Sequence, residues 1–253
     1  MSGPELCIVM PAYNEEGCIA NVVKAWCAIF DAHPFSDPKL IVVNDGSKDN
    51  TAQILDGLQQ QEKRLVAVHQ VNAGHGRALR SAYEQAAALD AQWVFHVDSD
   101  DQFVTSDFML LWEQREASHF ILGYRKSRFD AFHRLVITRI LRAVNLVLFG
   151  RYVIDANVPF RLIEGGYLKK LLSVVPDTVF APNIFLSILA ALDGQDIMHI
   201  PVHHQDRQTG TVSIVKLGLI KACLRCVKEL ALFRLTLKES LRKISQEEVS
   251  HES

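Results

Sequence analysis

The sequence predicts an α/β fold in which a mixed, mainly parallel sheet is flanked by helices. Short apolar runs alternate with helical patterns through the first half of the chain, and the loops between them are short. Such alternation is typical of parallel sheets with crossover helices. Polar residues gather where the apolar runs end, and parallel sheets bind ligands beyond the carboxyl ends of their strands. The pattern therefore also predicts where a functional site lies.

Five apolar runs are expected to form strands, because each is short and bounded by turn signals. They cover residues 6–10, 39–44, 65–69, 93–97 and 120–123. Helical patterns between the first four runs cover residues 14–30, 51–61 and 76–89. The first of these helices has Asn14 as a candidate N-cap, with Glu15 and Glu16 in its first turn.

Two basic amphipathic helices are expected in the second half. Residues 132–149 place Arg139 at the flank of a polar face that consists of Arg134, Thr138, Arg142 and Asn145. Residues 214–238 combine an apolar face with a basic face, made respectively of Ile220, Cys223, Leu224, Val227 and Ala231, and of Lys221, Arg225 and Lys228. A basic amphipathic helix can lie in a membrane interface, or it can pack on the core with its cations in water. Both interpretations stay open from the sequence.

The length of 253 residues and the apolar content of 49% suit a globular fold with a buried core. We expect a main domain over residues 1–213, an amphipathic helical region over 214–243 and a disordered tail over 244–253. There is no apolar run long enough to span a membrane in this sequence, and we expect no secretory leader and no disulfide framework among the five cysteines. A cytoplasmic setting is therefore expected. Cys223 and Cys226 form a C-x-x-C pair within a helical pattern, where packing is favoured over zinc or redox chemistry.

Charge is divided unevenly along the chain, although the net charge is only −2. Residues 1–130 contain 11 Lys and Arg against 18 Asp and Glu, and residues 131–243 contain 16 against 8. An acidic half beside a basic half suits a cation site next to a surface for anions. Chance segregation of solvated charges is the alternative.

The segment 98–102 brings three carboxylates and an amide to the end of a predicted strand. Asp98 and Asp100 are separated by one small residue, and Gln102 follows. Mg²⁺ and Mn²⁺ prefer oxygen ligands, and Mg²⁺ usually takes one or two carboxylates together with substrate phosphates. The cluster is thus a candidate metal and diphosphate site, although acidic loops are also ordinary surface turns.

Three motifs occur in a characteristic order: Pro11-Ala12-Tyr13-Asn14-Glu15-Glu16, then residues 42–51 around Asn44-Asp45-Gly46-Ser47, then Asp98-Ser99-Asp100-Asp101-Gln102. Together they resemble family 2 inverting glycosyltransferases of the GT-A fold, over roughly residues 5–215. The branch that transfers sugars to polyprenyl phosphates, the dolichyl-phosphate mannose synthase group, is the most similar one. Further motifs that resemble this branch are Gly123-Tyr124-Arg125, the segment 155–162 and the segment 207–213.

The resemblance implies a nucleotide-sugar site. Its members are Pro11, Tyr13, Glu15 and Asp45 for the base, and Asp98 for the ribose or sugar. Independently of the resemblance, Arg77 is a candidate for the base or diphosphate, because it follows two glycines at the start of a predicted helix. The resemblance also implies a divalent metal, Mg²⁺ or Mn²⁺, held by Asp98, Asp100 and Gln102. For Asp45 an Asx turn before Gly46 is the alternative role, and for Arg77 a solvated position. Asp101 replaces an apolar residue of the family pattern, so its role is in doubt.

The resemblance implies an anionic acceptor as well. A phosphate monoester needs cations rather than a general base, since its second pKa is about 6. The matching motifs offer Arg125, Arg139, Arg161, Arg207 and Ser213, of which Arg125 and Arg207 also join Asp98 and Asp100 as candidate catalytic residues. A buried structural position is an equal alternative for Arg161. Leu186 and Ser187 stand where many relatives have Glu, which leaves the acceptor less certain than the donor.

The sequence thus predicts a metal-dependent inverting transferase at the inner face of the membrane. It would move a hexose from UDP- or GDP-sugar to a polyprenyl phosphate. A soluble or saccharide acceptor is the first alternative, and a non-catalytic nucleotide-sugar binding module is the second. Processive polysaccharide synthases are disfavoured because Gln-x-x-Arg-Trp is absent from the sequence, and nucleotidyltransferases because there is no N-terminal glycine-rich loop ending in Pro-Lys. We expect no nucleic-acid partner, and a homodimer or a membrane partner protein is possible.

Overall fold

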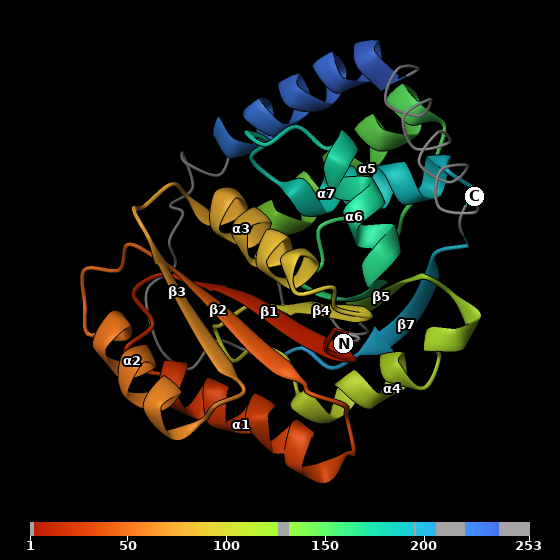
Figure 1. Cartoon of the computed structure of the whole chain (residues 1–253). Coiled ribbons are helices and arrows are strands. Elements are labelled where there is room, and N and C mark those ends of the chain that lie inside the picture. The colour runs from red at the N-terminus through yellow and green to blue at the C-terminus, as the bar shows by residue number, and fades with distance from the viewer. Residues whose placement is uncertain (1–2, 126–131, 195, 206–220, 238–253) are drawn as a thin grey trace.

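The computed structural model describes residues 3–125, 132–194, 196–205 and 221–237. Its centre is a seven-stranded sheet with the order β3-β2-β1-β4-β6-β5-β7 (Figure 1). The strands are β1 (Leu6–Ala12), β2 (Lys39–Asp45), β3 (Leu65–Gln70), β4 (Trp93–Val97), β5 (Phe120–Arg125), β6 (Phe160–Glu164) and β7 (Met198–Val202). Only β6 among them runs against its neighbours, pairing antiparallel with β4 and β5. The predicted mixed, mainly parallel sheet is confirmed.

Helices cover both faces of the sheet (Figure 1). On one face lie α1 (Ile19–Ala32), α2 (Thr51–Gln61) and α4 (Phe108–Trp112). On the other lie α3 (His75–Ala88), α6 (Gly165–Val174) and α7 (Pro182–Leu192), with α5 (Phe132–Phe149) beyond α7. Two short 3₁₀ helices, Thr105–Asp107 and Arg115–Ala117, flank α4.

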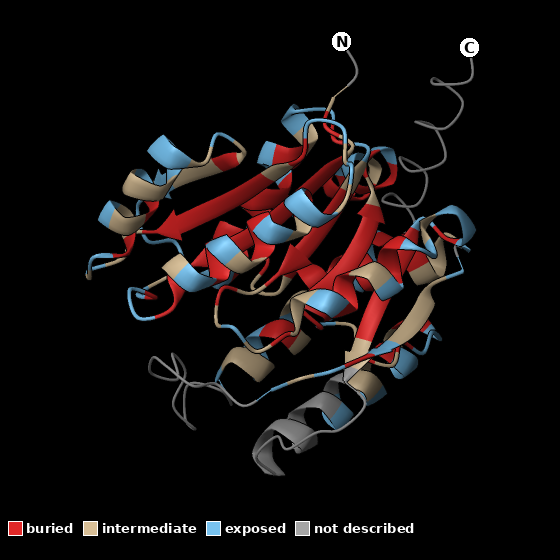
Figure 2. Ribbon diagram, turned by 90° about the horizontal axis from the view of Figure 1, so that it is seen from below, coloured by how far each residue is buried: buried red, intermediate tan, exposed pale blue. Residues whose placement is uncertain are grey.

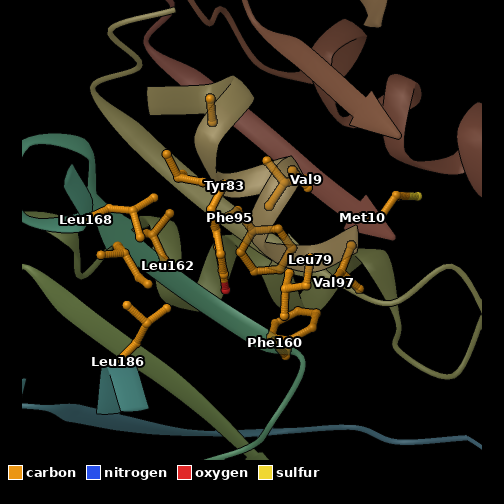
Figure 3. Packing of buried hydrophobic residues seen from close by; sticks show 14 of the residues in the cluster. Val9, Met10, Leu79, Tyr83, Phe95, Val97, Phe160, Leu162, Leu168 and Leu186 are labelled. Carbon is orange, nitrogen blue, oxygen red and sulfur yellow. The ribbon is translucent and has the colours of Figure 1, made fainter. Parts of the chain in front are cut away.

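The core lies on both sides of the sheet, and the central strands are buried along their whole length (Figure 2). Residues from β1, β4, β6, α3, α6 and α7 share one apolar cluster (Figure 3). Aromatic rings join α1 and α4 to the strands, with Phe95 packing at centroid distances of 4.8 Å from Phe160 and 4.9 Å from Phe108. Edge-to-face aromatic pairs of this kind add to the stabilisation that burial provides. The sheet is therefore a rigid platform for the loops at its ends.

One helix boundary differs from the prediction. The first helix begins at Ile19 rather than Asn14, and its N-cap position is Cys18. Asn14 instead has a φ of 55°, in the left-handed region that asparagine tolerates better than most residues. Its side chain is engaged with the loop after β2, as described below, so it is not available to cap a helix.

Residues 221–237 form a helix that packs on α7 and on the end of α5. Its buried face consists of Cys226, Leu230, Phe233 and Leu237. Of the predicted apolar face, Leu224 and Ala231 are exposed, whereas Cys223 and Val227 are half-buried. Of the described helices, none is both long and apolar enough to cross a membrane. The expected boundary at residues 213 and 214 and the expected tail 244–253 lie outside the described residues.

Candidate functional site

The predicted motifs meet at the edge of the sheet where the parallel strands have their carboxyl ends. Strands β2, β1 and β4 are neighbours, and each is followed by one of the three motif loops. The chain passes from β1 outward to β2 and β3 and then returns to β4 on the other side of β1. Such a reversal of strand order is where open α/β sheets bind their ligands.

Hydrogen bonds join the loop after β1 to the loop after β2. The Asn14 N–H donates to Ser47 Oγ at 2.9 Å, and the Lys48 N–H donates to Asn14 Oδ1 at 2.8 Å. The Glu15 N–H donates to Thr51 Oγ1 at 2.9 Å. We call these three contacts the loop clasp. The clasp holds the Tyr13–Glu15 segment against the start of α2.

Three predicted nucleotide-binding residues lie in the segment that the clasp holds or directly before it. Pro11 is buried within β1, Tyr13 is half-buried and the Glu15 side chain is 8% exposed. The Cys18 thiol donates to Glu15 Oε2 at 3.3 Å and to the Ser99 carbonyl at 3.5 Å. Cys18, which sequence reasoning overlooked, thus links the first loop to the acidic loop.

Asp45 joins the loop after β2 to the loop after β3. Its carboxylate accepts the backbone N–H groups of Ala73 at 2.9 Å and Gly74 at 2.8 Å, and the Gln70 side-chain amide at 2.7 Å. The alternative role of Asp45, an Asx turn before Gly46, is not seen, and the Ser47 N–H instead donates to Asn44 Oδ1 at 3.2 Å. The two loops approach so closely that a Cβ on Gly46 would lie 2.7 Å from the Asn72 nitrogen. Asp45 therefore shapes the cradle between β2 and α3.

The acidic loop contains three carboxylates in different environments. Asp98 and Asp100 are partly buried, and Asp100 Oδ1 accepts the Gln102 N–H at 3.3 Å. Ser99 anchors the loop to β1, because its hydroxyl donates to the Pro11 carbonyl at 2.8 Å. Asp101 is exposed and has a φ of 58°, so it occupies the left-handed position of the turn. That conformation favours Asp or Asn over an apolar residue and accounts for Asp101 without a ligand role.

The Gln102 side chain connects the acidic loop to the segment after β7. Its amide Nε2 donates to the Gln205 carbonyl at 3.3 Å, and the Gln205 N–H donates to the Gln102 carbonyl at 2.8 Å. With the nitrogen so engaged, the amide oxygen is the atom suited to a cation. His203 and His204 directly follow β7, and the His203 N–H donates to Asp107.

The donor set of the acidic loop fits a divalent metal that takes part of its coordination from a ligand. It offers two carboxylates and one amide oxygen, all hard donors. Within the described ranges, no group of three or more His, Cys, Asp and Glu side chains could hold a metal ion on its own. A site with only two carboxylates suits an ion that is also bound by a diphosphate.

A buried polar cluster lies directly beneath Asp98 and was missed from the sequence. His96 Nε2 lies 3.5 Å from Asp98 Oδ1, and its Nδ1 lies 3.4 Å from the Asn183 amide nitrogen. The Tyr83 hydroxyl donates to Asn183 Oδ1 at 2.9 Å. Burial lowers the pKa of His96 to about 4, so the ring is neutral near pH 7. A histidine inside an otherwise apolar strand was the signal that could have pointed to this cluster.

The amino-terminal end of α3 packs on the segment between α6 and α7. A Cβ on Gly76 would lie 2.2 Å from the Phe180 carbonyl oxygen, so the backbone approach needs glycine. Arg77 is exposed and donates to the Asp177 carbonyl at 3.0 Å. His75 Nε2 lies 3.9 Å from Asp98 Oδ1, which places the start of α3 beside the acidic loop.

The structure corrects the acceptor role predicted for Arg161. Arg161 belongs to β6, and its fully buried side chain contacts α7. The guanidinium donates to the carbonyls of Val158 at 2.8 Å, Asn183 at 3.1 Å and Ala156 at 3.1 Å, and to Ser187 Oγ at 3.3 Å. These acceptors use its donors, so Arg161 has the structural role that was the alternative. Ser187 is one of its partners.

The remaining acceptor candidates are not brought together within the described residues. Arg125 is the last residue of β5, at the same edge of the sheet as Asp98. Arg139 is exposed on α5. Arg207 and Ser213 lie outside the described residues.

The sequence of this chain is similar to a family model and to several proteins of known name. A family model described as "Glycosyl transferase family 2" matches residues 7–155. The chain is 26% identical over 217 residues to an undecaprenyl-phosphate 4-deoxy-4-formamido-L-arabinose transferase of Edwardsiella ictaluri, and the match covers 85% of the chain and 63% of that relative. It is 27% identical over 184 residues to a UDP-N-acetylglucosamine–dolichyl-phosphate N-acetylglucosaminyltransferase of Methanococcus voltae, covering 65% of the chain and 71% of the relative.

Solved structures share the fold. Glucosyl-3-phosphoglycerate synthase of Mycobacterium tuberculosis aligns with a TM-score of 0.66 at 18% identity, covering 91% of this chain and 81% of that one. Another crystal structure of that enzyme contains Mn²⁺, UDP-glucose and glycerol 3-phosphate, and aligns with a TM-score of 0.63 at 19% identity over 92% of this chain and 80% of that one. The architecture is therefore that of the GT-A glycosyltransferases, as predicted.

Proposed function

The chain belongs to glycosyl transferase family 2, and from this premise we propose that it transfers a hexose from a nucleotide sugar to a polyprenyl phosphate. The transfer inverts the anomeric carbon and takes place at the inner face of the membrane. UDP and GDP are the nucleotide candidates. The relatives named above act, by their names, on undecaprenyl phosphate and dolichyl phosphate, which supports the lipid acceptor.

One observation carries the proposal. The acidic loop, the loop clasp and the cradle that Asp45 shapes between β2 and α3 lie at neighbouring strand ends and are connected by hydrogen bonds. Ser99 joins the acidic loop to β1, and Asp45 joins β2 to the start of α3. A nucleoside diphosphate presents a base, a ribose and two phosphates, and this edge offers partners for each. Acceptor-type side chains are Glu15 and Asp45, and backbone donors lie at the start of α3.

The donor is held in the proposed site by its nucleotide. Tyr13 packs on the base, and the carboxylates of Glu15 and Asp45 accept its N–H groups. In the proposed site, Arg77 in the first turn of α3 contacts the diphosphate. The positive end of the helix dipole at this position also favours an anion. Asp98 positions the ribose or the sugar.

Asp98, Asp100 and Gln102 are the side chains that would hold Mg²⁺ or Mn²⁺. When bound, the cation supplies charge neutralisation for the departing nucleoside diphosphate. The neutral His96 supports Asp98 from beneath, which keeps the carboxylate of Asp98 in place without adding a competing positive charge.

The acceptor phosphate attacks from the face of the sugar opposite the leaving group. A monoester with a second pKa of about 6 is mostly dianionic near neutrality, so no side chain has to remove a proton. Arginines must instead hold it, and Arg125, Arg139 and Arg207, with Ser213, remain the candidates. Arg161 is left out because it is buried and occupied.

A soluble phosphate-bearing acceptor is the second candidate. A structural neighbour of the same fold was solved in complex with Mn²⁺, UDP-glucose and glycerol 3-phosphate, a soluble phosphate monoester, which supports this candidate. A non-catalytic sugar-nucleotide binding module is disfavoured, because Asp98, Asp100 and Gln102 are all retained at one loop.

The proposal is tested by presenting radiolabelled nucleotide sugars to the protein with polyprenyl phosphate or with soluble acceptors. A labelled, mild-acid-labile lipid product that requires Mg²⁺ or Mn²⁺ is expected. Label that appears only on soluble acceptors would support the second candidate instead. Binding of the nucleotide sugar without turnover on any acceptor would support the non-catalytic module.

A further inference from the structure

The helix formed by residues 221–237 is apolar on two opposite sides. Its inward face packs on the core through Cys226, Leu230, Phe233 and Leu237. Its outward face exposes Leu224 by 66%, Leu232 by 55% and Leu235 by 81%. A helix that only packs on a core needs an apolar stripe on one side and has polar residues on the other. The outward leucines therefore need another explanation.

The outward leucines are close together on one face, and cations surround them. Leu224, Ala231 and Leu235 are spaced by seven and four residues, so they lie in line along a helix. Lys221, Arg225 and Lys228 are exposed on the same side. We call this set of residues, with Leu232, the leucine face. An exposed leucine alone is unremarkable, but several on one helix face among basic residues are typical of interfacial helices.

The leucine face continues toward the end of α5. Arg234 Nε donates to the Leu148 carbonyl at 2.7 Å, so the two helices touch there. Val147, the residue before Leu148, is 82% exposed, and Leu235 follows Arg234. Arg139 and Ile140 are also exposed on α5. Apolar and basic side chains therefore extend over two helices rather than one. Figure 1 shows the 221–237 helix in blue, on the side of the sheet opposite α1 and α2.

The helix is connected to the proposed donor site through one segment. Arg225 Nη2 donates to the Thr178 carbonyl at 3.3 Å, and the Phe180 N–H donates to Glu229 Oε2 at 2.7 Å. The other side of the same segment meets α3, where Arg77 donates to the Asp177 carbonyl at 3.0 Å. The segment 177–180 thus lies between the 221–237 helix and the start of α3.

We propose that the leucine face is the surface by which this protein binds the lipid bilayer, and that its occupant is an interface containing anionic lipids. The leucines enter the boundary between headgroups and acyl chains, and Lys221 and Lys228 meet the lipid phosphates. The proposed function explains why this protein would bind a membrane, since a polyprenyl phosphate is a membrane lipid, and in this respect the inference rests on it. The exposed leucines and cations support the inference independently.

The test measures binding of the full chain to vesicles without any donor or polyprenyl phosphate. Vesicles of phosphatidylcholine with phosphatidylglycerol are expected to bind the protein, and phosphatidylcholine alone to bind it less. The double variant Leu224→Glu, Leu235→Glu is expected to lose about tenfold or more in partition. The matched control is Leu110→Glu, since Leu110 is 42% exposed on α4, across the sheet, and this variant should bind like the unmodified chain.

A second measurement does not depend on loss of binding. An environment-sensitive dye at Leu235→Cys should shift to the blue when vesicles are added, and the same dye at Leu110→Cys should not. Transfer to a short, water-soluble prenyl phosphate should be retained by the leucine double variant, which shows that the fold and the site are intact. If no prenyl phosphate is used by the unmodified chain, the proposed function fails while the vesicle result still stands.

Two outcomes would overturn the inference. One is partition of the leucine double variant equal to that of the unmodified chain, with no dye shift at position 235. The other is a change from dimer to monomer in the double variant with unchanged vesicle binding, because the leucine face would then be a contact between two copies of the chain.

Discussion

At the scale of single residues, the neighbours Asp100 and Asp101 have separate roles despite their identical chemistry. Asp100 is partly buried and hydrogen bonds within the acidic loop, whereas Asp101 is exposed and occupies a left-handed turn position. The turn conformation explains why an acidic residue stands where relatives carry an apolar one. The two residues therefore form a natural pair of test and control.

Asp100→Ala is expected to reduce metal-dependent sugar transfer by about a hundredfold or more, because a divalent cation supplies several kcal/mol of charge stabilisation. Transfer is measured from a labelled nucleotide sugar, and thermal unfolding shows whether the fold is kept. Asp101→Asn, which also tolerates a positive φ, should stay within a few-fold of the unmodified chain. Near-normal transfer by Asp100→Ala would remove this residue from the proposed site.

At the scale of elements, the loops of the site are held in place by hydrogen bonds between one loop and the next. The loop clasp depends on Thr51, the first residue of α2, whose hydroxyl accepts the Glu15 N–H and donates to Asp49 Oδ1 at 2.6 Å. Thr51 is fully buried. Its hydroxyl therefore connects the first two motifs.

Thr51→Val should lower the free energy of unfolding by about 1–3 kcal/mol, because it leaves the Glu15 N–H buried without its partner. The Michaelis constant for the nucleotide sugar should rise, since Tyr13 and Glu15 lose their support. Urea unfolding and initial rates measure the two effects. Thr51→Ser keeps the hydroxyl and should restore most of both; failure of that rescue would mean that the methyl group, rather than the clasp, matters.

The contact between α3 and the segment at Phe180 gives a second test at this scale. Gly76→Ala would place a methyl group 2.2 Å from the Phe180 carbonyl oxygen, so the backbone must shift. We expect a loss of about 1–3 kcal/mol in the free energy of unfolding, as in other overpacked sites.

The control for this substitution is another helical glycine. A Cβ on Gly57 in α2 meets nothing within 4 Å, so Gly57→Ala should stabilise the fold by about 0.5–1 kcal/mol through helix propensity alone. Both variants are compared by urea unfolding. Equal effects of the two substitutions would mean that the approach at Gly76 is not tight.

Elements with strong local signals were predictable from the sequence. The helix at Thr51–Gln61 and the strand at Trp93–Val97 have the predicted bounds. Strands β6 and β7 were not predicted, because their positions depend on pairing with distant strands. The start of α1 was wrong for a similar reason: Asn14 has the chemistry of an N-cap, but a partner 34 residues away engages its side chain.

The site could also be predicted where local sequence signals define it, and could not where it depends on distant parts of the chain. The edge of the sheet where Asp45 and the acidic loop lie was predictable, because strand ends are visible in the sequence. The difference between a phosphate-binding arginine and a buried one was not, since Arg161 is distinguished only by its tertiary partners. Residues of the outward face of the 221–237 helix, such as Leu224 and Ala231, were recognised as apolar in the sequence, but hydropathy alone did not identify which side of the helix is buried, because both sides contain leucines.

At the scale of the whole molecule, the two halves of the chain contribute to one sheet but have different charge. Strands β1 to β4, from the acidic half, carry the motif loops, whereas the 221–237 helix belongs to the basic half. This places the proposed cation site and the proposed anion-facing surface on different parts of one fold. Long-range attraction to an anionic membrane would then come from the half that does not bind the metal.

Two histidines, the buried His96 and the half-buried His199, make the stability of the whole fold sensitive to mild acid. Burial lowers the pKa of His96 from 6.5 to about 4, and burial also lowers the pKa of His199 on β7. Because both folded-state values lie below the unfolded value, the unfolded chain takes up protons that the folded chain does not. The stabilisation is therefore present above about pH 6.5 and is lost as the pH falls toward the folded-state values.

We expect the free energy of unfolding to fall by about 2 kcal/mol between about pH 7 and pH 5 from His96 alone, with a further loss from His199. Urea unfolding at the two pH values measures the change. The lowered pKa values of Asp49 and Glu62 act below their ordinary values of 3.8 and 4.5, so these carboxylates contribute little in this interval. His96→Gln should be less stable than the unmodified chain near pH 7, since it alters the contacts to Asn183 and Asp98, but its stability should change less with pH. An equal pH dependence in the variant would show that His96 takes up its proton as readily in the folded chain as in the unfolded one.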